Sequence, residues 1–314
     1  MTTGLIDDDR FLAHDTGAHH PETAARIGAI RQSLAAHADY AQLQRIEASA
    51  ADISIIENSH SLAYVRRAAR ACASGAPYLD TPDVAVCEYS YEVALLAAGA
   101  PLALADAMVA GHIDNGFALL RPPGHHAERE AAMGFCLFNN VAILARYLQR
   151  QHGLDKIAIV DWDVHHGNGT QHSFEEDPSV LYVSTHQYPY YPGTGAAYET
   201  GTGRGRGATL NCPMPAGATD SAYERAFFEE ILPKLEHFKP ECVIISAGFD
   251  AHRDDPLADV QLSTSCFRWM TERLMEVAAR HGGGRLLSVL EGGYNLERLG
   301  DCVSAHVERL MAPL

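Results

Sequence analysis

The chain has 314 residues, 47% of them hydrophobic and 20% charged, which excludes disorder, collagen and coiled coil as descriptions of the whole chain. Acidic residues outnumber basic ones by 40 to 24, so the formal net charge is −16 and we expect no direct binding to nucleic acid. The 7 cysteines form no C-x-x-C pair, which argues against a disulfide framework and against a cysteine zinc ribbon.

Short apolar runs rich in Val, Ile and Leu predict strands that are buried on both faces of a parallel sheet. These runs cover residues 117–120, 157–160, 180–183, 208–210, 242–245 and 286–290. Helical patterns cover residues 22–36, 62–73, 91–109, 141–151, 222–238, 266–281 and 296–311. The alternation predicts a single α/β domain over residues 1–314, with a doubly wound parallel sheet and helices on both of its faces.

Two segments bear on localisation. The first ten residues, MTTGLIDDDR, lack the basic and apolar regions of a secretory signal. The longest weakly polar stretch, residues 93–104, looks too short and too weakly hydrophobic to span a bilayer. We therefore expect a cytoplasmic protein without membrane association. The sequence leaves open whether the chain forms a homo-oligomer.

Polar motifs follow the predicted strands at their carboxyl ends. They are RPPGHHA (121–127), DWDVHHGNG (161–169), STH (184–186), SAGFDAH (246–252) and EGGY (291–294). Ligands of open parallel sheets bind outside the carboxyl ends of the strands. The motifs therefore predict one composite site at that edge of the sheet.

A metal site is predicted within these motifs. Asp161, Asp163 and His165 alternate at a strand end, and alternate side chains point to one face, so Asp163 and His165 could bind one ion. Asp250 is the candidate third ligand, which leaves a fourth position open, as catalytic zinc requires. For Asp161 alone, capping of the next helix stays an alternative.

A histidine pair and a tyrosine complete the predicted chemistry. His125 and His126 follow a Pro-Pro-Gly turn, and neighbouring imidazoles suppress each other's protonation unless a carboxylate restores it. The pair could hold one charged histidine and one general base, or it could be a surface or metal-binding pair. Tyr294, after a Gly-Gly turn, could donate a hydrogen bond to a substrate carbonyl and its oxyanion, or could only pack.

Other chemistries lack their motifs. The sequence has no G-x-S-x-G elbow and no HExxH, and GTGRGRG (201–207) precedes a predicted strand and has no Lys-Ser/Thr tail, so we reject nucleotide binding. Water activated by a metal, with a histidine base and a tyrosine donor, remains. This set suits hydrolysis of a neutral carbonyl compound such as an amide.

The sequence resembles the histone deacetylase superfamily, which also includes acetylpolyamine amidohydrolases and acetoin-utilisation proteins. The shared motifs are HPETAAR (20–26), RPPGHHA, MGFCLFNN (133–140), DWDVHHGNGTQ (161–171), PGTG (192–195), SAGFDAHRDDPL (246–257) and EGGYN (291–295). HHGNG is typical of the class II branch, whereas class I has HHGDG. The resemblance implies the arginase/deacetylase α/β fold with a central eight-stranded parallel sheet, and deacetylation that depends on one Zn²⁺ per chain.

The resemblance also implies roles for single residues. The zinc ligands would be Asp163, His165 and Asp250. His126 would be the general base toward water and then the general acid toward the departing amine. Asn168 would be the partner of its ring. His125 would be its electrostatic partner, bonded to Asp161, while Tyr294 would polarise the acyl carbonyl together with zinc. Because Asn168 is neutral where class I has aspartate, His126 should gain less charge stabilisation.

One or two potassium ions are implied beside the zinc. The first would be bound by side chains of Asp161 and Ser184 and by backbone carbonyls of Asp163, His165 and Thr185. The second would be bound mostly by backbone oxygens near Phe174, Asp177, Val180 and Ala208. An acyl-lysine tunnel would be walled by Phe135, Tyr191 and Leu257, with Gly134 at the base of one wall. Tyr191 stands where phenylalanine is commoner and adds a hydroxyl at the rim.

The expected substrate is an N-acyl-lysine with an acetyl or related short acyl group. An acetylpolyamine amidohydrolase is the alternative, because Asp254 and the acidic surface would attract polyamines; Leu257, where polyamine-selective members are expected to have an acidic residue, favours lysine. A catalytically silent acyl-lysine-binding module would have lost a ligand or the tyrosine, and this chain keeps them. An arginase-like dimanganese site would need further Asp and His ligands.

Overall fold

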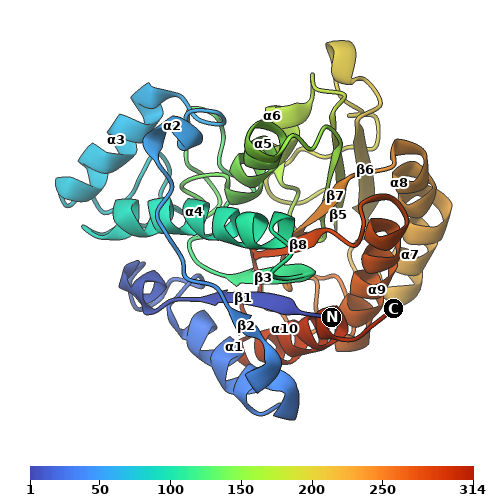
Figure 1. Ribbon diagram of the computed structural model, residues 1–314. Helices are drawn as coiled ribbons and strands as arrows, with labels where there is room; N and C mark the ends of the chain where they lie inside the picture. The colour runs from blue at the N-terminus through green and yellow to red at the C-terminus, as the bar shows by residue number, and fades with distance from the viewer.

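The computed structural model describes the backbone of residues 1–314 and every side chain except that of Ala38. Eight parallel strands form one sheet in the order β2-β1-β3-β8-β7-β4-β5-β6 (Figure 1). The strands are β1 (Thr3–Asp7), β2 (Gln44–Arg45), β3 (Asn115–Leu119), β4 (Ile157–Asp161), β5 (Val180–Gln187), β6 (Thr209–Met214), β7 (Cys242–Ala247) and β8 (Leu286–Leu290). The predicted parallel α/β sheet and its eight strands are confirmed.

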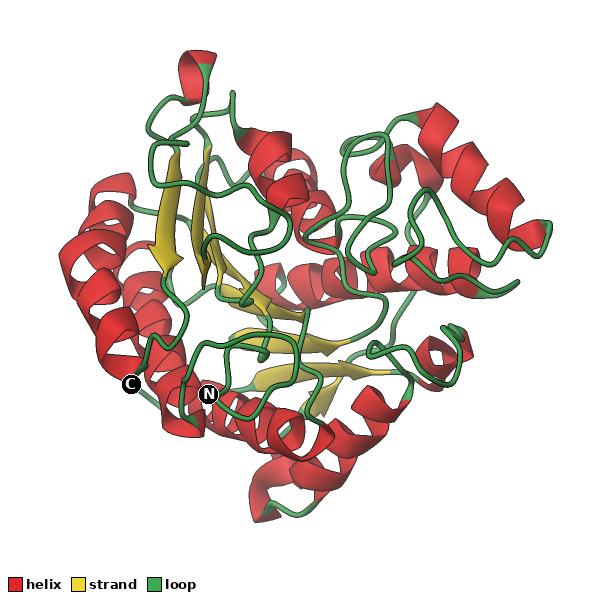
Figure 2. Cartoon of the chain, turned by 180° about the vertical axis from the view of Figure 1, so that it is seen from behind, coloured by secondary structure: helices red, strands yellow, loops and turns green.

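Helices cover both faces of the sheet, as Figures 1 and 2 show. The helices are α1 (Ala25–Ala35), α2 (Ile53–Ile56), α3 (Leu62–Ala73), α4 (Ser90–Val109), α5 (Asn140–His152), α6 (Asn168–Phe174), α7 (Asp220–Ala226), α8 (Leu232–Phe238), α9 (Thr264–His281) and α10 (Leu296–Met311). A π-helical segment, Phe227–Ile231, joins α7 to α8. Short 3₁₀ segments lie at Asp9–Ala13, Ala38–Gln42 and Gly203–Gly205.

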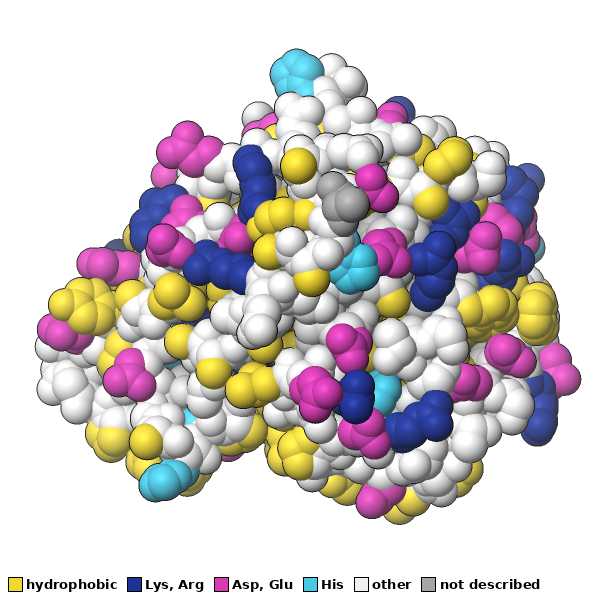
Figure 3. Space-filling view, turned by 90° about the horizontal axis from the view of Figure 1, so that it is seen from below, with side chains coloured by type: hydrophobic (Ala, Val, Ile, Leu, Met, Phe, Trp, Pro, Cys, Tyr) yellow, Lys and Arg dark blue, Asp and Glu magenta, His cyan; other side chains and the backbone are white. Residues whose placement is uncertain are grey.

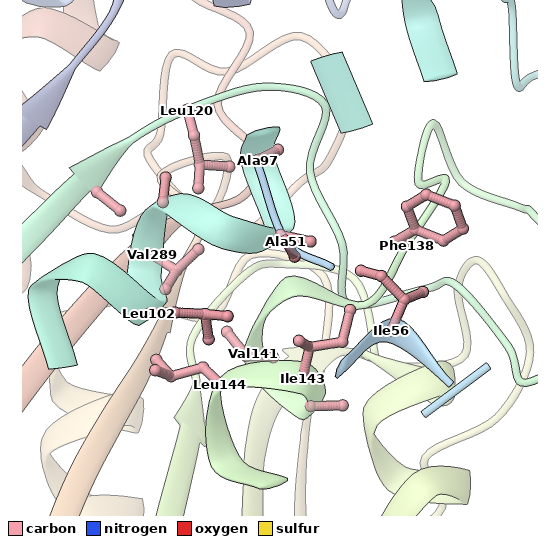
Figure 4. Packing of buried hydrophobic residues seen from close by; sticks show 14 of the residues in the cluster. Ala51, Ile56, Ala97, Leu102, Leu120, Phe138, Val141, Ile143, Leu144 and Val289 are labelled. Carbon is pink, nitrogen blue, oxygen red and sulfur yellow. The ribbon is translucent and has the colours of Figure 1, made fainter. Parts of the chain in front are cut away.

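Two hydrophobic cores lie on opposite faces of the sheet. Ile157 and Ile159 of β4 belong to the core that contains α4 and α5, and Figure 4 shows Leu102 and Leu144 of these helices in that cluster. The intervening Ala158 belongs to the core that contains α1, α9 and α10. Because successive side chains of a strand point to opposite faces, a strand buried on both sides has no polar alternation. This explains the continuous apolar runs of the sequence.

The structure also differs from the sequence-based prediction in places. Strand β1, the edge strand β2 beside it and the short helix α6 have no counterpart among the predicted elements, and the helix expected from residue 22 begins only at Ala25. The apolar stretch 93–104 belongs to the 20-residue helix α4, which is long and apolar enough to cross a membrane by length and composition. The expectation that it is too short is therefore wrong, although 72% of its most apolar window is buried inside the protein, as in a core helix.

Charged side chains of both signs are interspersed over the face of the molecule seen in Figure 3. Acidic side chains there lie between basic ones. Surface ion pairs of the protein include Arg268 with Glu308 and Arg298 with Asp254. The strong negative balance of the chain is therefore partly offset locally on the surface.

Candidate metal centre and pocket

Strand pairing brings the predicted motifs together at the carboxyl edge of the sheet. Strand β4 lies between β5 and β7, and Asp161 at its end is in register with Ser184 of β5 and with Ser246 of β7. Strand β8, which the EGGY motif follows, pairs with β7. Motifs far apart in the sequence therefore meet at neighbouring strand ends.

Asp163, His165 and Asp250 form a compact group of potential metal ligands. Their ligand atoms all lie within 4.8 Å of one another, and Nδ1 of His165 is 3.1 Å from an oxygen of each carboxylate. Strand β4 ends at Asp161, so Asp163 and His165 lie in the loop beyond the strand. The predicted placement of Asp163 and His165 on the strand is therefore wrong, although the two residues and Asp250 do come together.

The electrostatics of this group suit a divalent cation. Burial and the neighbouring Asp163 raise the pKa of Asp250 to about 7. Burial also opposes ionisation of Asp163, but His125 and His165 outweigh it and lower the pKa of that carboxyl. Two buried carboxylates at this distance need a compensating positive charge. Two carboxylates and one imidazole, with a fourth position open to a pocket, are a donor set that fits catalytic zinc.

The carboxylates are held by backbone N–H groups on their other oxygens. Val164 donates its N–H to Asp250 at 2.8 Å, and Gly292 donates its N–H to Asp163 at 2.8 Å. A Cβ on Gly292 would lie 2.2 Å from an oxygen of Asp250, so only glycine allows the loop after β8 to approach this closely. The glycine of the EGGY motif thus serves the metal centre directly.

His125 and His126 lie beside the metal centre in different environments. Nδ1 of His125 is 3.0 Å from Asp161, whereas Nδ1 of His126 is 2.8 Å from the amide oxygen of Asn168. Burial disfavours the charged form of His125, but Asp163 and Asp161 outweigh it and raise its pKa to about 10. Burial and the adjacent His125 push the pKa of His126 well below its ordinary value. The pair therefore contains one charged and one neutral imidazole.

Glu291, to which the sequence analysis gave no role, fastens the histidine turn to the end of β8. It accepts N–H bonds from Gly124 at 2.6 Å and His125 at 3.1 Å, and a hydroxyl bond from Ser246 at 3.0 Å. With His125 and Cys136 it forms a second group of potential ligands. Its oxygens are already engaged in these bonds, so we assign it to positioning. Its place as the first residue of EGGY is the signal that was available.

Tyr294 lies on the loop after β8, which neighbouring side chains hold in place. Its backbone N–H donates to Asp255 at 2.7 Å, and the guanidinium of Arg26 lies 5.1 Å from its ring centroid. Arg26 also donates to the carbonyl of Gly293 at 2.7 Å. Burial and the nearby Asp250 raise the pKa of the Tyr294 phenol well above its ordinary value, so it stays a protonated hydrogen-bond donor.

A fully buried ion-pair network supports Arg26. Glu22 accepts two bonds of 2.7 Å from Arg121 and one of 3.2 Å from Arg26. Burial opposes ionisation of Glu22, but the two arginines outweigh it and lower its pKa to about 2. Glu22 and Arg26 belong to the HPETAAR motif and Arg121 to RPPGHHA, and no sequence pattern indicated that these three side chains pair.

The metal centre opens into a pocket with a volume of about 190 Å³. The pocket is lined by Asp83, His126, Gly134, Phe135, His165, Tyr191, Leu257 and Tyr294. The expected tunnel residues are therefore all present in its wall. Asp83 is an addition: it accepts bonds from the N–H of Gly134 at 2.9 Å and from the hydroxyl of Tyr191 at 3.2 Å. As a lone acidic residue in a loop, Asp83 gave no spacing signal in the sequence.

The residues expected around potassium occupy two neighbouring places. Asp161 and Ser184 are buried side by side on β4 and β5, and Asp161 also receives bonds from the hydroxyl of Tyr182 at 3.2 Å and the N–H of Asp163 at 3.1 Å. The residues expected around the second ion lie near the start of β5. The carbonyl of Phe174 accepts a bond from the N–H of Asp177, and the carbonyl of Asp177 accepts one from Val180. The carbonyl of Ala208 accepts a bond from the N–H of Tyr182.

A buried triad of potential metal ligands beneath a pocket lined by a histidine and a tyrosine, on a parallel α/β sheet, suits a metal-dependent hydrolase. Residues 20–310 match the model of the Histone deacetylase domain, and the chain belongs to that family. Its fold is the arginase/deacetylase fold, and the enzymes of the family are zinc-dependent deacetylases.

Relatives and a solved structure agree with this assignment. The chain is 42% identical over 309 residues to "Histone deacetylase 10, chloroplastic" of Oryza sativa, covering 93% of this chain and 70% of that protein. It is 46% identical over 228 residues to human "Polyamine deacetylase HDAC10", covering 71% of this chain and 34% of that protein. The crystal structure of the HDA15 HD domain superposes with a TM-score of 0.92 at 40% identity, covering 98% and 88% of the two chains.

Proposed function

We propose that the chain is a zinc-dependent amidohydrolase that removes acetyl or related short acyl groups from N-acyl-lysine. The observation that carries this proposal is the position of His126, His165 and Tyr294 in the wall of one pocket, with Asp163 and Asp250 directly behind His165. One zinc ion would be held by Asp163, His165 and Asp250. When bound, it supplies Lewis-acid polarisation of the acyl carbonyl and makes water a stronger acid.

Different side chains of the pocket transfer the protons and stabilise the negative charge that develops on the acyl oxygen. His126, neutral and with Nδ1 donating to Asn168, presents Nε2 to the pocket and takes a proton from the attacking water. Tyr294 donates its hydroxyl to the oxyanion that forms on the acyl carbon. The C–N bond then breaks, the proton on His126 passes to the departing amine, and the carboxylate and the free amine are released. His125 stays charged against Asp161 throughout.

A second candidate, hydrolysis of acetylpolyamines, is favoured by two observations. Asp83 places a carboxylate in the pocket wall, and a human relative is named a polyamine deacetylase. Leu257 lines the same pocket and contributes no charge, which supports acyl-lysine as the first choice. The deciding experiment is a panel of acetyl-lysine peptides, longer acyl-lysines and acetylpolyamines assayed with zinc-loaded protein. A kcat/KM at least tenfold higher for acetylpolyamines would reverse the order of the two candidates.

We further propose that potassium binds at Asp161 and Ser184, with carbonyls of Asp163, His165 and Thr185. The buried, paired positions of Asp161 and Ser184 on adjacent strands support this proposal. A second ion near Phe174, Asp177, Val180 and Ala208 has weaker support, because the carbonyls of Phe174, Asp177 and Ala208 already accept backbone bonds. Replacing K⁺ by tetramethylammonium at constant ionic strength should lower the midpoint of thermal unfolding, because an ion bound only by the folded state stabilises it.

A further inference from the structure

The carboxylate of Glu128 lies behind the proposed general base, two residues along the chain from it. Nδ2 of Asn168 donates to Oε1 of Glu128 at 2.5 Å, and Nδ1 of His172 is 2.8 Å from the same oxygen. Asn168 and His172 are four residues apart in α6 and therefore lie on one face of that helix. His126, Asn168, Glu128 and His172 thus form one continuous chain of hydrogen bonds.

Close packing keeps α6 against the loop that carries His126 and Glu128. A Cβ on Gly169 would lie 2.2 Å from the carbonyl oxygen of Ala127, so the glycine allows the helix to touch that loop. The backbone carbonyl of Glu128 is 2.9 Å from Nδ1 of His60, and its N–H donates to Ala131 at 2.9 Å. The backbone at Glu128 is therefore held in place by hydrogen bonds of both its N–H and its carbonyl group.

The chemistry of these partners determines which way the Asn168 amide faces. A carboxylate only accepts hydrogen bonds, so the NH₂ of Asn168 must face Glu128 and its oxygen must face His126. An amide oxygen also only accepts, so Nδ1 of His126 must carry a proton. In a neutral imidazole the other nitrogen then has the free electron pair, and that nitrogen, Nε2, is the one available to the pocket.

We propose that Glu128 is a positioning residue which, through Asn168, fixes the tautomer of His126 in which Nε2 is the base. The inference rests on the proposed hydrolase function and extends it by a residue that does not touch substrate. Nδ2 of Asn168 also lies 3.3 Å from the carbonyl oxygen of His126 and 3.2 Å from the sulfur of Met133, but its shortest contact and its only charged acceptor is Glu128. Loss of that carboxylate therefore removes the strongest of the contacts that orient the amide. A rotated amide would favour the opposite tautomer of His126, in which Nε2 carries the proton and is not a base.

Glu128 can be replaced without disturbing the catalytic pocket. Glu128 and His172 line a separate cavity of about 220 Å³, together with Asn58, Ser59, Arg129, Arg146 and Ser173. The side chain of Glu128 is 25% exposed and that of His172 is 43% exposed, so this end of the chain of hydrogen bonds reaches solvent. A charged replacement at position 128 therefore finds water and does not enter the core.

Two variants test whether the hydrogen-bond acceptor at position 128, and not the size or charge of the side chain, matters for catalysis. In Glu128→Gln the amide oxygen can keep both contacts, because both fall on Oε1, so kcat should stay within about threefold of wild type. In Glu128→Lys only donors remain, the Asn168 amide should rotate, and kcat should fall at least about tenfold with KM nearly unchanged. Adding Asn168→Asp to Glu128→Lys restores acceptors toward both neighbours and should return most of the lost activity. The matched control is Glu236→Lys, because Glu236 is also a half-exposed carboxylate bonded to a histidine, His281.

A measurement independent of turnover completes the test. The ¹⁵N spectrum of histidine-labelled, zinc-loaded protein should show a proton on Nδ1 of His126 in wild type and in Glu128→Gln, and on Nε2 in Glu128→Lys. Equal kcat losses in Glu128→Gln and Glu128→Lys, or an unchanged His126 tautomer in Glu128→Lys, would overturn the inference. If wild-type protein hydrolyses no acyl-amine, the proposed function fails, and the spectrum alone decides whether Glu128 sets the tautomer.

Discussion

The rings of His125 and His126 lie 4.0 Å apart between centroids, yet their surroundings shift their pKa values in opposite directions. Asp161 bonds His125, while the neutral amide of Asn168 bonds His126. Adjacent imidazoles that titrate together would compete for one proton, whereas this division assigns the charge to one ring and basicity to the other. The arrangement favours an unprotonated base at His126 beside a protonated ring at His125.

A change of Asn168→Asp should move the pH dependence of activity. A carboxylate next to His126 stabilises the protonated imidazole and so raises its pKa. Because only the unprotonated ring acts as a base, the acidic limb of the kcat/KM profile should shift to higher pH. Steady-state kinetics from about pH 5 to pH 9 measure this shift. An acidic limb at the wild-type position would show that this limb does not report His126.

Removal of a single ligand should empty the metal site. Asp250→Ala takes away one of two carboxylates and leaves Asp163 and His165, too few donors to hold zinc in a catalytic site. Metal analysis after gel filtration should give one zinc per chain for wild type and strongly reduced zinc for the variant. Asp254→Ala is the matched control, because Asp254 lies in the same loop but is 47% exposed and pairs with Arg298. Equal zinc in both variants would remove Asp250 from the site.

The residues of the metal centre could be found from the sequence because parallel strands end at one edge, so that polar motifs after buried runs must converge there. The residues that position them were less accessible. Glu128 and Asp83 are single acidic side chains in loops, and no periodicity connects them to their partners. Only the fold shows that Glu128 faces α6, a helix that the sequence pattern did not predict. The strand geometry assumed for Asp163 failed because β4 ends two residues earlier.

Stability should depend on pH through Glu22. Its pKa falls from 4.5 in the unfolded chain to about 2 in the folded protein, so the folded state gains from ionised Glu22. This contribution is fully present above about pH 4.5 and is lost as the pH falls toward 2. Glu22→Gln leaves Arg26 and Arg121 buried without a counter-charge, which should cost about 3 kcal/mol at pH 7. The free energy of unfolding that Glu22→Gln loses relative to wild type should be smaller at pH 3 than at pH 7.

Urea unfolding at both pH values tests this expectation. The control is Glu297→Gln, because Glu297 also pairs with an arginine but its side chain is 79% exposed. Exposed ion pairs contribute about 0–1 kcal/mol, so the control should unfold almost like wild type at either pH. A Glu22→Gln protein whose deficit is as large at pH 3 as at pH 7 would show that the cost comes from packing and not from the charge.

The last prediction concerns the hydroxyl of Tyr294. A hydrogen bond to an oxyanion strengthens as negative charge develops, so its loss raises the transition-state barrier more than it weakens substrate binding. Tyr294→Phe should remain folded and zinc-loaded, because the contacts of Arg26 with the ring and with the Gly293 carbonyl do not involve the hydroxyl. Its kcat should fall about 10²–10³-fold, roughly 3–4 kcal/mol, with KM little changed. If Tyr294 only packs against the loop, phenylalanine keeps the ring and kcat stays within about threefold of wild type, well under 1 kcal/mol.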